Sequence, residues 1–383
     1  MFKLLDYIDI GTNLLKAHFT RRFNIAPPPR VIAYTVTWRC NASCDMCGIK
    51  NVDSNLKKKE HELTAKDISR IFKDPYLKNI DLIRFTGGEP FIKEDFEEVV
   101  NEIFKNTKTK IYYITTNGYY SQRIFKFIED LAPKMKNLVI QISLDAIGEE
   151  HDKIRKIPKL NENITNTLRG LSELRKKYKF YFGINQTVTV NTVQYIDRIA
   201  ELCDKYKCDH KIYLAYEVHE SDILEGRKLY NELKLYSDVE DGESKKIFQA
   251  VRKHYKMKSS QKRDIFSPRT LWDILQGEIL EGSENRIFEQ KISPNPPCLA
   301  LFFYLRLLPD GKIMPCTLKP EVIGDLKNQS FKEVWCSKKA RDVRSEIRRC
   351  KGCWVECDIV PNIVYSPHFV KKIFKKMFFQ SKR

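Results

Sequence analysis

The chain is organised around the segment Trp38-Arg39-Cys40-Asn41-Ala42-Ser43-Cys44-Asp45-Met46-Cys47. An apolar run, Val31-Ile32-Ala33-Tyr34-Thr35-Val36, leads into it and predicts a buried β-strand, with the cysteines on the loop that follows. Three thiolates at spacings of four and three can bind three irons of a cube-shaped 4Fe–4S cluster. The fourth iron then lacks a protein ligand and can bind a substrate or cofactor.

Other interpretations of the three cysteines explain less. A structural zinc site needs four ligands, and no fourth Cys or His is close by in the sequence. Disulfides would leave one cysteine over, and inert buried thiols have no reason to cluster in this way. The spacing therefore favours an iron–sulfur cluster.

The pattern Cys40-x3-Cys44-x2-Cys47 resembles the signature of the radical S-adenosylmethionine (radical SAM) enzymes. The resemblance extends from about Val31 to Cys357, which is most of the chain. It implies that the amino and carboxylate groups of SAM chelate the open iron. It also implies reductive cleavage of SAM to methionine and a 5′-deoxyadenosyl radical, which abstracts hydrogen from a substrate.

Composition sets broad limits on the function. The net charge of +18 suits an anionic partner such as nucleic acid, a lipid surface or an acidic substrate, but it also suits a merely solvated surface. No apolar run reaches the ~20 residues of a membrane span, and the first residues lack the layout of a signal peptide. We therefore expect a cytoplasmic protein whose eleven cysteines serve metal ligation rather than disulfides.

From Val31 onward, strand and helix patterns alternate. The predicted strands are Val31–Val36, Leu82–Thr86, Ile111–Thr116, Leu138–Ser143, Tyr181–Val188 and Lys211–Ala215. The predicted helices are Ala65–Phe72, Glu94–Phe104, Ser121–Leu131, Ile164–Tyr178 and Thr192–Tyr206. Repeated βα units predict a parallel α/β fold. The family resemblance implies a partial (β/α)6 TIM-like barrel; a doubly wound sheet would give the same pattern.

In either fold the chemistry belongs at the carboxyl ends of the strands, and the remaining motifs lie there. Gly87-Gly88-Glu89 follows the second strand and resembles the motif with which the family holds the SAM amino group. Its two glycines free the backbone for close approach to a ligand, and Glu89 can accept from an ammonium. Asn117 follows the third strand in a Thr-x-Asn-Gly pattern that the family often places close to SAM.

The fourth strand ends in Ser143-Leu144-Asp145 and leads to His151 and Arg155, a stretch that resembles the subgroup with C-terminal SPASM (auxiliary-cluster) domains. By this resemblance Ser143 and Asp145 bind ribose hydroxyls or the SAM carboxylate, and Arg155 pairs with that carboxylate. We expect His151 to be a capping or packing residue. The fifth strand carries Asn185, Gln186 and Thr187 inside an apolar run, and the SAM pocket or the substrate can supply their partners.

A second group of cysteines forms a C-terminal module: Cys298, Cys316, Cys350, Cys353 and Cys357. A β-hairpin with an Asp-Gly turn is predicted just before Cys316. Four thiolates make a closed site for a cluster or for structural zinc. The spacing resembles the SPASM domain, and the small cysteine count resembles its single-cluster twitch variant. The first four form the expected ligand set, Cys357 replaces one of them or remains free, and Cys336 lies off the pattern.

Both ends of the chain carry basic amphipathic patterns. We divide the chain into an N-terminal helix with a proline linker (1–29), a radical SAM core (30–236), a helical linking insertion (237–291), an auxiliary-cluster domain (292–360) and a basic tail (361–383). In the tail, Phe369, Ile373, Phe374, Met377 and Phe378 form one side of a helix and lysines the other. This pattern predicts either peripheral contact with an anionic membrane or a helix docked on the protein.

The sequence thus predicts an enzyme that cleaves SAM and abstracts hydrogen from an unidentified peptide or small molecule. A 4Fe–4S cluster binds SAM, an auxiliary 4Fe–4S cluster assists oxidation or substrate binding, and a flavodoxin or ferredoxin acts as reductant. Modification of a membrane lipid or lipid-linked sugar is a second possibility. A non-enzymatic metal-binding protein that holds nucleic acid is a third, and Gly87-Gly88-Glu89 counts against it.

Overall fold

The computed structural model describes residues 4–135, 137–217, 234–235, 241–259, 268–319, 321–350 and 353–380. Its centre is a curved sheet whose first six strands run parallel, each paired with the next. These strands are β1 (Val31–Thr37), β2 (Leu82–Gly87), β3 (Ile111–Thr116), β4 (Leu138–Ser143), β5 (Tyr181–Val188) and β6 (Asp209–Leu214). Because β6 is an edge strand and does not pair with β1, the barrel is open.

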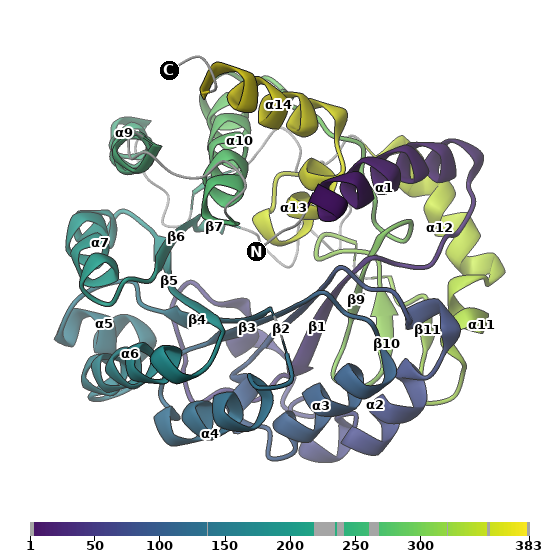
Figure 1. Cartoon of the computed structure of the whole chain (residues 1–383), viewed down its shortest axis with the longest axis horizontal. Helices are drawn as coiled ribbons and strands as arrows, with labels where there is room; N and C mark the ends of the chain where they lie inside the picture. The colour runs from purple at the N-terminus through teal and green to yellow at the C-terminus, as the bar shows by residue number, and fades with distance from the viewer. Residues whose placement is uncertain are drawn as a thin grey trace.

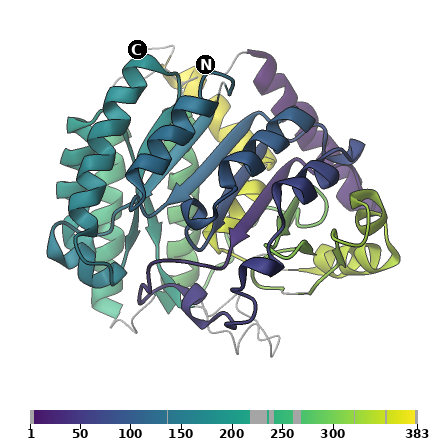
Figure 2. The same ribbon diagram turned by 90° about the horizontal axis from the view of Figure 1, so that it is seen from below.

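A layer of helices covers the convex face of the sheet (Figures 1 and 2). Alternate strand residues such as Ile83 and Phe85 point into this layer and form the main hydrophobic core. The helices are α2 (Ala65–Phe72), α3 (Phe96–Asn106), α4 (Ser121–Leu131), α5 (Glu149–Arg155), α6 (Leu160–Lys177) and α7 (Ile196–Lys205). The predicted βα alternation is confirmed; the short helix α5 was not predicted.

The C-terminal module joins the sheet of the barrel instead of standing apart from it. Strand β9 (Tyr304–Leu307) pairs in parallel with β1, and the predicted hairpin continues through β10 (Lys312–Met314) to β11 (Gly324–Asp325). The resulting order is β11-β10-β9-β1-β2-β3-β4-β5-β6. Helices α11 (Phe331–Trp335) and α12 (Lys338–Arg349) follow. Strands β7 (Tyr216–Glu217) and β8 (Lys234–Leu235) form a separate pair.

The other helices lie across the open side of the barrel and beyond its β6 edge (Figure 1). They are α1 (Leu4–Phe23), α9 (Asp241–Ser259), α10 (Pro268–Phe288), α13 (Glu356–Val364) and α14 (Pro367–Gln380). Helices α10, α13 and α14 pack together around Leu275, Ile279, Ile363, Phe369 and Ile373. The open side of the barrel is therefore closed by helices from the linking insertion and from the C-terminal part of the chain.

The tail helix α14 departs from one expectation. Phe369 and Ile373, predicted on the membrane-facing side, are 4% and 7% exposed because they pack on α10 and α13. Lys372 forms ion pairs with Glu278 and Glu281 of α10. The docked-helix alternative therefore describes these residues, and the side chains of Phe374, Met377 and Phe378 lie outside the described part. Among the described helices, none has the length and apolar character needed to cross a membrane.

Candidate active site

One cavity at the carboxyl ends of the strands is lined by all three cysteines of the loop, Cys40, Cys44 and Cys47. The loop leaves the buried strand β1, whose seven residues are all buried. Six of the predicted SAM-binding residues line the same cavity: Gly87, Gly88, Glu89, Asn117, Ser143 and Arg155. The structure therefore gathers motifs from β1, β2, β3 and β4 around a single space. Asp145 is the exception.

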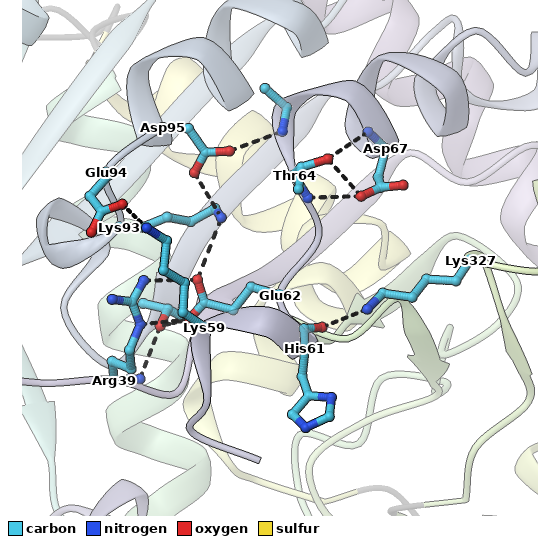
Figure 3. Close-up of polar contacts among 12 residues, drawn as sticks. Arg39, Lys59, His61, Glu62, Thr64, Asp67, Lys93, Glu94, Asp95 and Lys327 are labelled. Atoms are coloured by element: carbon cyan, nitrogen blue, oxygen red, sulfur yellow. Dashed lines mark hydrogen bonds and ion pairs between the residues drawn. The ribbon is translucent and has the colours of Figure 1, made fainter. Parts of the chain in front are cut away.

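The start of the cysteine loop is fixed by Glu62, which sequence reasoning missed (Figure 3). Its carboxylate, 4% exposed, accepts from Arg39 Nε at 2.9 Å and Nη2 at 3.0 Å, and from the Thr37 hydroxyl. The ammonium of Lys93 lies 3.5 Å away and also pairs with Asp95 at 2.8 Å. Because Arg39 precedes Cys40, this buried network holds the loop where it leaves the strand.

Gly87 and Gly88 make room for the cysteine loop itself. A Cβ at Gly88 would lie 1.8 Å from the Arg39 carbonyl oxygen, and one at Gly87 would lie 2.4 Å from that of Thr37. Gly87 also has a φ of +124°. The backbone N–H groups of Gly88 and Glu89 donate to Thr37 O at 2.7 Å and Arg39 O at 2.9 Å. The sequence predicted that these glycines allow close approach to a ligand. The structure shows in addition that they allow the Gly87–Glu89 segment to approach the start of the cysteine loop.

Glu89 is 1% exposed and organises the end of β3. Its Oε1 accepts from Thr116 Oγ1 at 2.7 Å and Phe91 N at 3.1 Å, and its Oε2 accepts from Asn117 N at 2.7 Å. Burial raises the pKa of this carboxyl to about 7, although the three hydrogen bonds oppose the shift. A carboxylate oxygen can accept more than one hydrogen bond, so Oε2 still has capacity for an ammonium in the cavity.

Asn117 connects the β3 end to the cysteine loop. Its Nδ2 donates to Asn41 Oδ1 at 2.7 Å, and its Oδ1 accepts from Tyr119 N at 3.0 Å. Both ends of the amide are therefore engaged within the protein. We assign Asn117 to positioning the walls of the cavity that it lines.

Asp145 is fully buried and is not among the residues that line the cavity. Its Oδ2 accepts from Arg155 Nε at 2.7 Å, and its Oδ1 accepts from Thr187 N at 2.8 Å. Arg155 also reaches Cys44, with Nη1 3.8 Å from Sγ. Asp145 is thus a positioning residue for Arg155, and Arg155 stands beside both the cavity and a cysteine.

His151 is a packing residue, as expected. It is fully buried in α5, and its Nδ1 accepts from Asp145 N at 3.1 Å. Burial lowers the pKa of the imidazole to about 4, so it is neutral near pH 7. Gln186 of β5 is also satisfied internally, by Asp145 O, Thr192 O and His210.

The donor set fits an iron–sulfur cluster. Burial raises the pKa of Cys40 to about 11 and also raises that of Cys44, so the loop thiols gain their charge by binding metal. Among the described residues, no three His, Cys, Asp or Glu side chains converge closely enough for one metal ion. Cluster ligands bind different irons and need not converge on one point.

Four C-terminal cysteines also lie together. The thiol of Cys298 hydrogen-bonds to Cys350 and interacts electrostatically with Cys353 and Cys316. That hydrogen bond, followed by burial, raises its pKa, and burial raises the pKa of Cys316 to about 12. The side chain of Cys357 lies outside the described residues. Cys336 stands apart at the end of α11, with Sγ 3.7 Å from the hydroxyl of Tyr76.

Helix α13 fixes the loops that carry these cysteines, and sequence reasoning did not identify it. Asp358 accepts from Thr317 N at 2.9 Å and from the Tyr304 hydroxyl. Asn362 Oδ1 accepts from Leu299 N at 2.8 Å. Because Thr317 and Leu299 follow Cys316 and Cys298, the two side chains set the positions of both thiols. No local sequence signal connects these residues.

The remaining pair of cysteines, Cys203 and Cys208, is buried and lines a hollow of about 350 Å³ among residues of α7, α9 and α10. This hollow contains none of the residues predicted to bind SAM or a cluster. Cys203 Sγ donates to Asp209 O at 3.7 Å, as expected of a packed thiol.

The fold and the two cysteine sets define an iron–sulfur protein with an open α/β barrel. Residues 34–206 match the model of the radical SAM superfamily, and residues 298–354 match that of the SPASM iron–sulfur cluster-binding domain. The chain belongs to the radical SAM superfamily and carries a C-terminal SPASM domain. Its cofactors are accordingly a 4Fe–4S cluster with SAM in the core and iron–sulfur in the C-terminal domain.

Curated relatives include GTP 3′,8-cyclases. The chain is 27% identical to that of Aquifex aeolicus over 150 residues, covering 39% of this chain and 43% of the relative. It is 26% identical to that of Helicobacter pylori over 303 residues, covering 77% and 83%. The chain therefore spans less than half of the length of the Aquifex relative.

Similar solved structures include anSMEcpe with bound AdoMet and Cp18Cys peptide. It has a TM-score of 0.57 and 18% identity, with coverage of 92% of this chain and 98% of that chain. Streptococcus suis SuiB has a TM-score of 0.58 and 15% identity, with coverage of 90% and 74%. At this identity the likeness supports the fold: an open barrel with a C-terminal extension.

Proposed function

We propose that the protein is a radical SAM enzyme that abstracts hydrogen from a substrate held on the concave face of the sheet. The observation that carries this proposal is the single cavity shared by Cys40, Cys44, Cys47 and the SAM-binding motifs. A reduced 4Fe–4S cluster held by Cys40, Cys44 and Cys47 would supply the electron for cleavage of SAM to methionine and a 5′-deoxyadenosyl radical, which would abstract the substrate hydrogen. The shared cavity and the family assignment favour an enzyme over a non-enzymatic protein that binds metal and nucleic acid.

Within this cavity the protein groups have separate tasks. Glu89 Oε2 accepts from the SAM ammonium, and Ser143 and Arg155 bind hydroxyl or carboxylate oxygens. Glu62, Asn117 and Asp145 fix the loops and the guanidinium that surround SAM. Cys40, Cys44 and Cys47 hold the cluster.

The C-terminal cysteines Cys298, Cys316, Cys350 and Cys353 hold an auxiliary 4Fe–4S cluster that accepts an electron from the substrate radical or binds the substrate. A buried chain of hydrogen bonds connects strand β6 of the barrel to helix α13. Ile212 N of β6 donates to Tyr255 OH at 3.3 Å, which donates to Gln276 at 3.3 Å. Gln276 donates to Glu356 of α13 at 3.0 Å. Strand β6 is thus linked to the helix that fixes the loops of the C-terminal cysteines.

The substrate is a peptide or a small molecule. One of the similar solved structures is SuiB bound to precursor peptide SuiA, and the curated relatives are named as cyclases of GTP. Both possibilities remain proposals for this chain. A flavodoxin or ferredoxin is the proposed reductant.

The test is SAM cleavage by anaerobically reconstituted full-length protein with dithionite. We expect 5′-deoxyadenosine from the wild type and none after replacement of Cys40, Cys44 and Cys47 by Ala. Absence of 5′-deoxyadenosine from iron-loaded wild-type protein would overturn the proposal.

A second proposal is peripheral contact with an anionic lipid surface through α1. Leu15, Phe19 and Phe23 recur every four residues on one face of α1 and are 70%, 57% and 56% exposed. The opposite face is attached to the protein: Ala17 and Thr20 are buried, and Arg21 donates to Cys298 O and Arg348 O.

Leu15, Phe19 and Phe23, here called the α1 stripe, have positively charged neighbours, which favour an anionic partner. Lys16 and Arg22 flank it and are exposed, and the adjoining helix α12 ends in exposed Arg348 and Arg349. Apolar side chains with flanking cations suit the interface of an anionic bilayer, where each cation contributes about 1 kcal/mol. Such a location also suits the alternative substrates, a membrane lipid or a lipid-linked sugar.

A further inference from the structure

Three polar residues of neighbouring strands form a row that leads away from the SAM cavity. Ser143 of β4 pairs in register with Asn185 of β5, which pairs in register with Lys211 of β6. Residues in register on parallel strands point to the same face. Because Ser143 lines the cavity, the whole row faces the interior of the barrel. Strand spacing places the backbone of Lys211 about 10 Å from that of Ser143.

Among the described residues, the ammonium of Lys211 has no carboxylate oxygen within ion-pair distance, although it is electrostatically coupled to Glu356. Lys211 is 7% exposed, and its Nζ lies 4.0 Å from the ring centre of Trp272 and 4.7 Å from that of Tyr113. Aromatic faces orient a cation but accept no proper hydrogen bond from it. A buried ammonium has three donors to satisfy, so its surroundings call for an acceptor.

Two buried residues between Lys211 and the SAM cavity have side-chain oxygens that accept no hydrogen bond among the described residues. Asn185 is 5% exposed and Gln141 is 1% exposed, and neither Asn185 Oδ1 nor Gln141 Oε1 has a hydrogen-bond partner among the described residues. Gln141 pairs in register with Thr115 and Gly183, so it belongs to the same inward face. Buried polar atoms are normally satisfied, and a bound ligand is one source of partners.

A second cation, Arg84, lies close to Lys211. The Arg84 guanidinium lies 5.8 Å from the centre of the same Tyr113 ring. The carboxyl of Glu356, to which Arg84 and Lys211 are both electrostatically coupled, is hydrogen-bonded by Gln276. Both cations are thus coupled to the same carboxyl. A negatively charged ligand group is favoured over a neutral or cationic one.

We propose that Lys211, Asn185 and Gln141 form a substrate subsite. Lys211 binds a carboxylate or phosphate group of the substrate, and the side-chain oxygens of Asn185 and Gln141 accept hydrogen bonds from substrate atoms next to that group. A substrate anchored there extends along the row toward Ser143 and presents a carbon to the SAM cavity. That the bound anion is a substrate rests on the proposed function. That Lys211 binds an anion rests on the burial and contacts of its ammonium. It narrows the substrate to an anionic small molecule or an acidic peptide side chain.

The test uses full-length, cluster-loaded protein with SAM under anaerobic conditions at constant ionic strength. Inorganic phosphate and succinate are titrated as probes, with succinamide as the neutral counterpart of succinate, and tryptophan fluorescence is recorded because Trp272 touches Lys211. We expect saturable changes with both anions and none with succinamide. Lys211→Met should weaken anion binding about tenfold or more.

Two further variants separate the subsite from general effects. Asn185→Asp keeps the side-chain size and places a carboxylate beside Lys211, so it should also weaken anion binding about tenfold or more. Lys177→Met removes a lysine that lies 4.9 Å from the Tyr178 ring centre on the outer surface, and it should bind anions as the wild type does. An unresponsive wild type, or equal anion affinity in Lys211→Met, would overturn the subsite. Absence of 5′-deoxyadenosine from the wild type would instead contradict the proposed function.

Discussion

Arg155 and Cys44 lie in contact although 111 residues separate them in sequence, with Nη1 of Arg155 3.8 Å from Sγ of Cys44. The same guanidinium donates to the fully buried carboxylate of Asp145 at 2.7 Å. The cysteine loop after β1 is thereby connected to the end of β4. Cys44, Arg155 and Asp145 therefore form one connected group of side chains.

Arg155→Met should leave Asp145 buried without its charge partner. Removing one member of a buried ion pair costs about 3–5 kcal/mol, so we expect a lower melting temperature and at least about tenfold slower SAM cleavage. Lys153→Met is the matched control, because Lys153 lies two residues before Arg155 and forms only an exposed pair with Glu150 among the ion pairs of the described residues. Equal melting temperature and rate in Arg155→Met and the control would contradict the assigned role.

Glu62→Gln should loosen the start of the cysteine loop. The change keeps the size of the side chain but leaves Arg39 and the buried Lys93 without the charge that both face. We expect faster loss of iron from the core cluster to a chelator, with the auxiliary iron retained. Glu60→Gln, at an exposed position two residues earlier, is the control. An unchanged rate of iron release in Glu62→Gln would show that the network does not hold the loop.

Iron content should separate the two cysteine sets. Two cubane clusters predict roughly eight irons per chain in the wild type. Replacement of Cys40, Cys44 and Cys47 should leave about four, and replacement of Cys298 and Cys316 should leave about four of the other set. Cys336→Ala should retain the full complement, because its thiol stands beside Tyr76. Stoichiometric zinc in anaerobically purified protein would instead favour a structural zinc site in the C-terminal domain.

His151 predicts an acid-sensitive component of stability. Its pKa is about 4 in the folded protein, below the ordinary value of about 6.5, so the unfolded chain binds more protons between these values. The contribution is complete above about pH 6.5 and is lost as the pH falls toward 4, by about 3 kcal/mol at most. In His151→Asn the amide oxygen can accept from Asp145 N, and this component should vanish.

The measurement is urea unfolding of both proteins from pH 4.5 to 7.5. Glu89, with a raised pKa of about 7, adds the opposite slope over much of this range, but it does so in both proteins and cancels in their difference. A pH-independent difference between His151→Asn and the wild type would exclude a linked protonation of His151.

The α1 stripe predicts the membrane behaviour. Sedimentation with vesicles should be strong for anionic lipid, weaker for neutral lipid and reduced by salt. Phe19→Ser with Phe23→Ser should lower the affinity about tenfold or more. The control, Leu56→Ser with Met257→Ser, removes residues that are 42% and 60% exposed elsewhere on the surface. Equal sedimentation of the two double variants would exclude α1 as the anchor.

The sequence alone determined the elements of the barrel and the two cysteine sets. Strands such as Ile111–Thr116 and Tyr181–Val188 were predicted with the bounds that the structure shows. Hydrophobic periodicity and ligand spacing are local properties, so neighbouring residues suffice to reveal them. The order of the motifs along the strands also placed them at one edge of the sheet.

Only the tertiary structure decided which groups meet. Glu62 lies in a lysine-rich segment without a motif, and folding alone brings its carboxylate to Arg39. Asp145 carried a family motif, but its burial beside Arg155 removes it from the cavity. The row of Ser143, Asn185 and Lys211 exists because strand register aligns residues from three separate βα units. Such contacts depend on long-range packing, which no local pattern in the chain encodes.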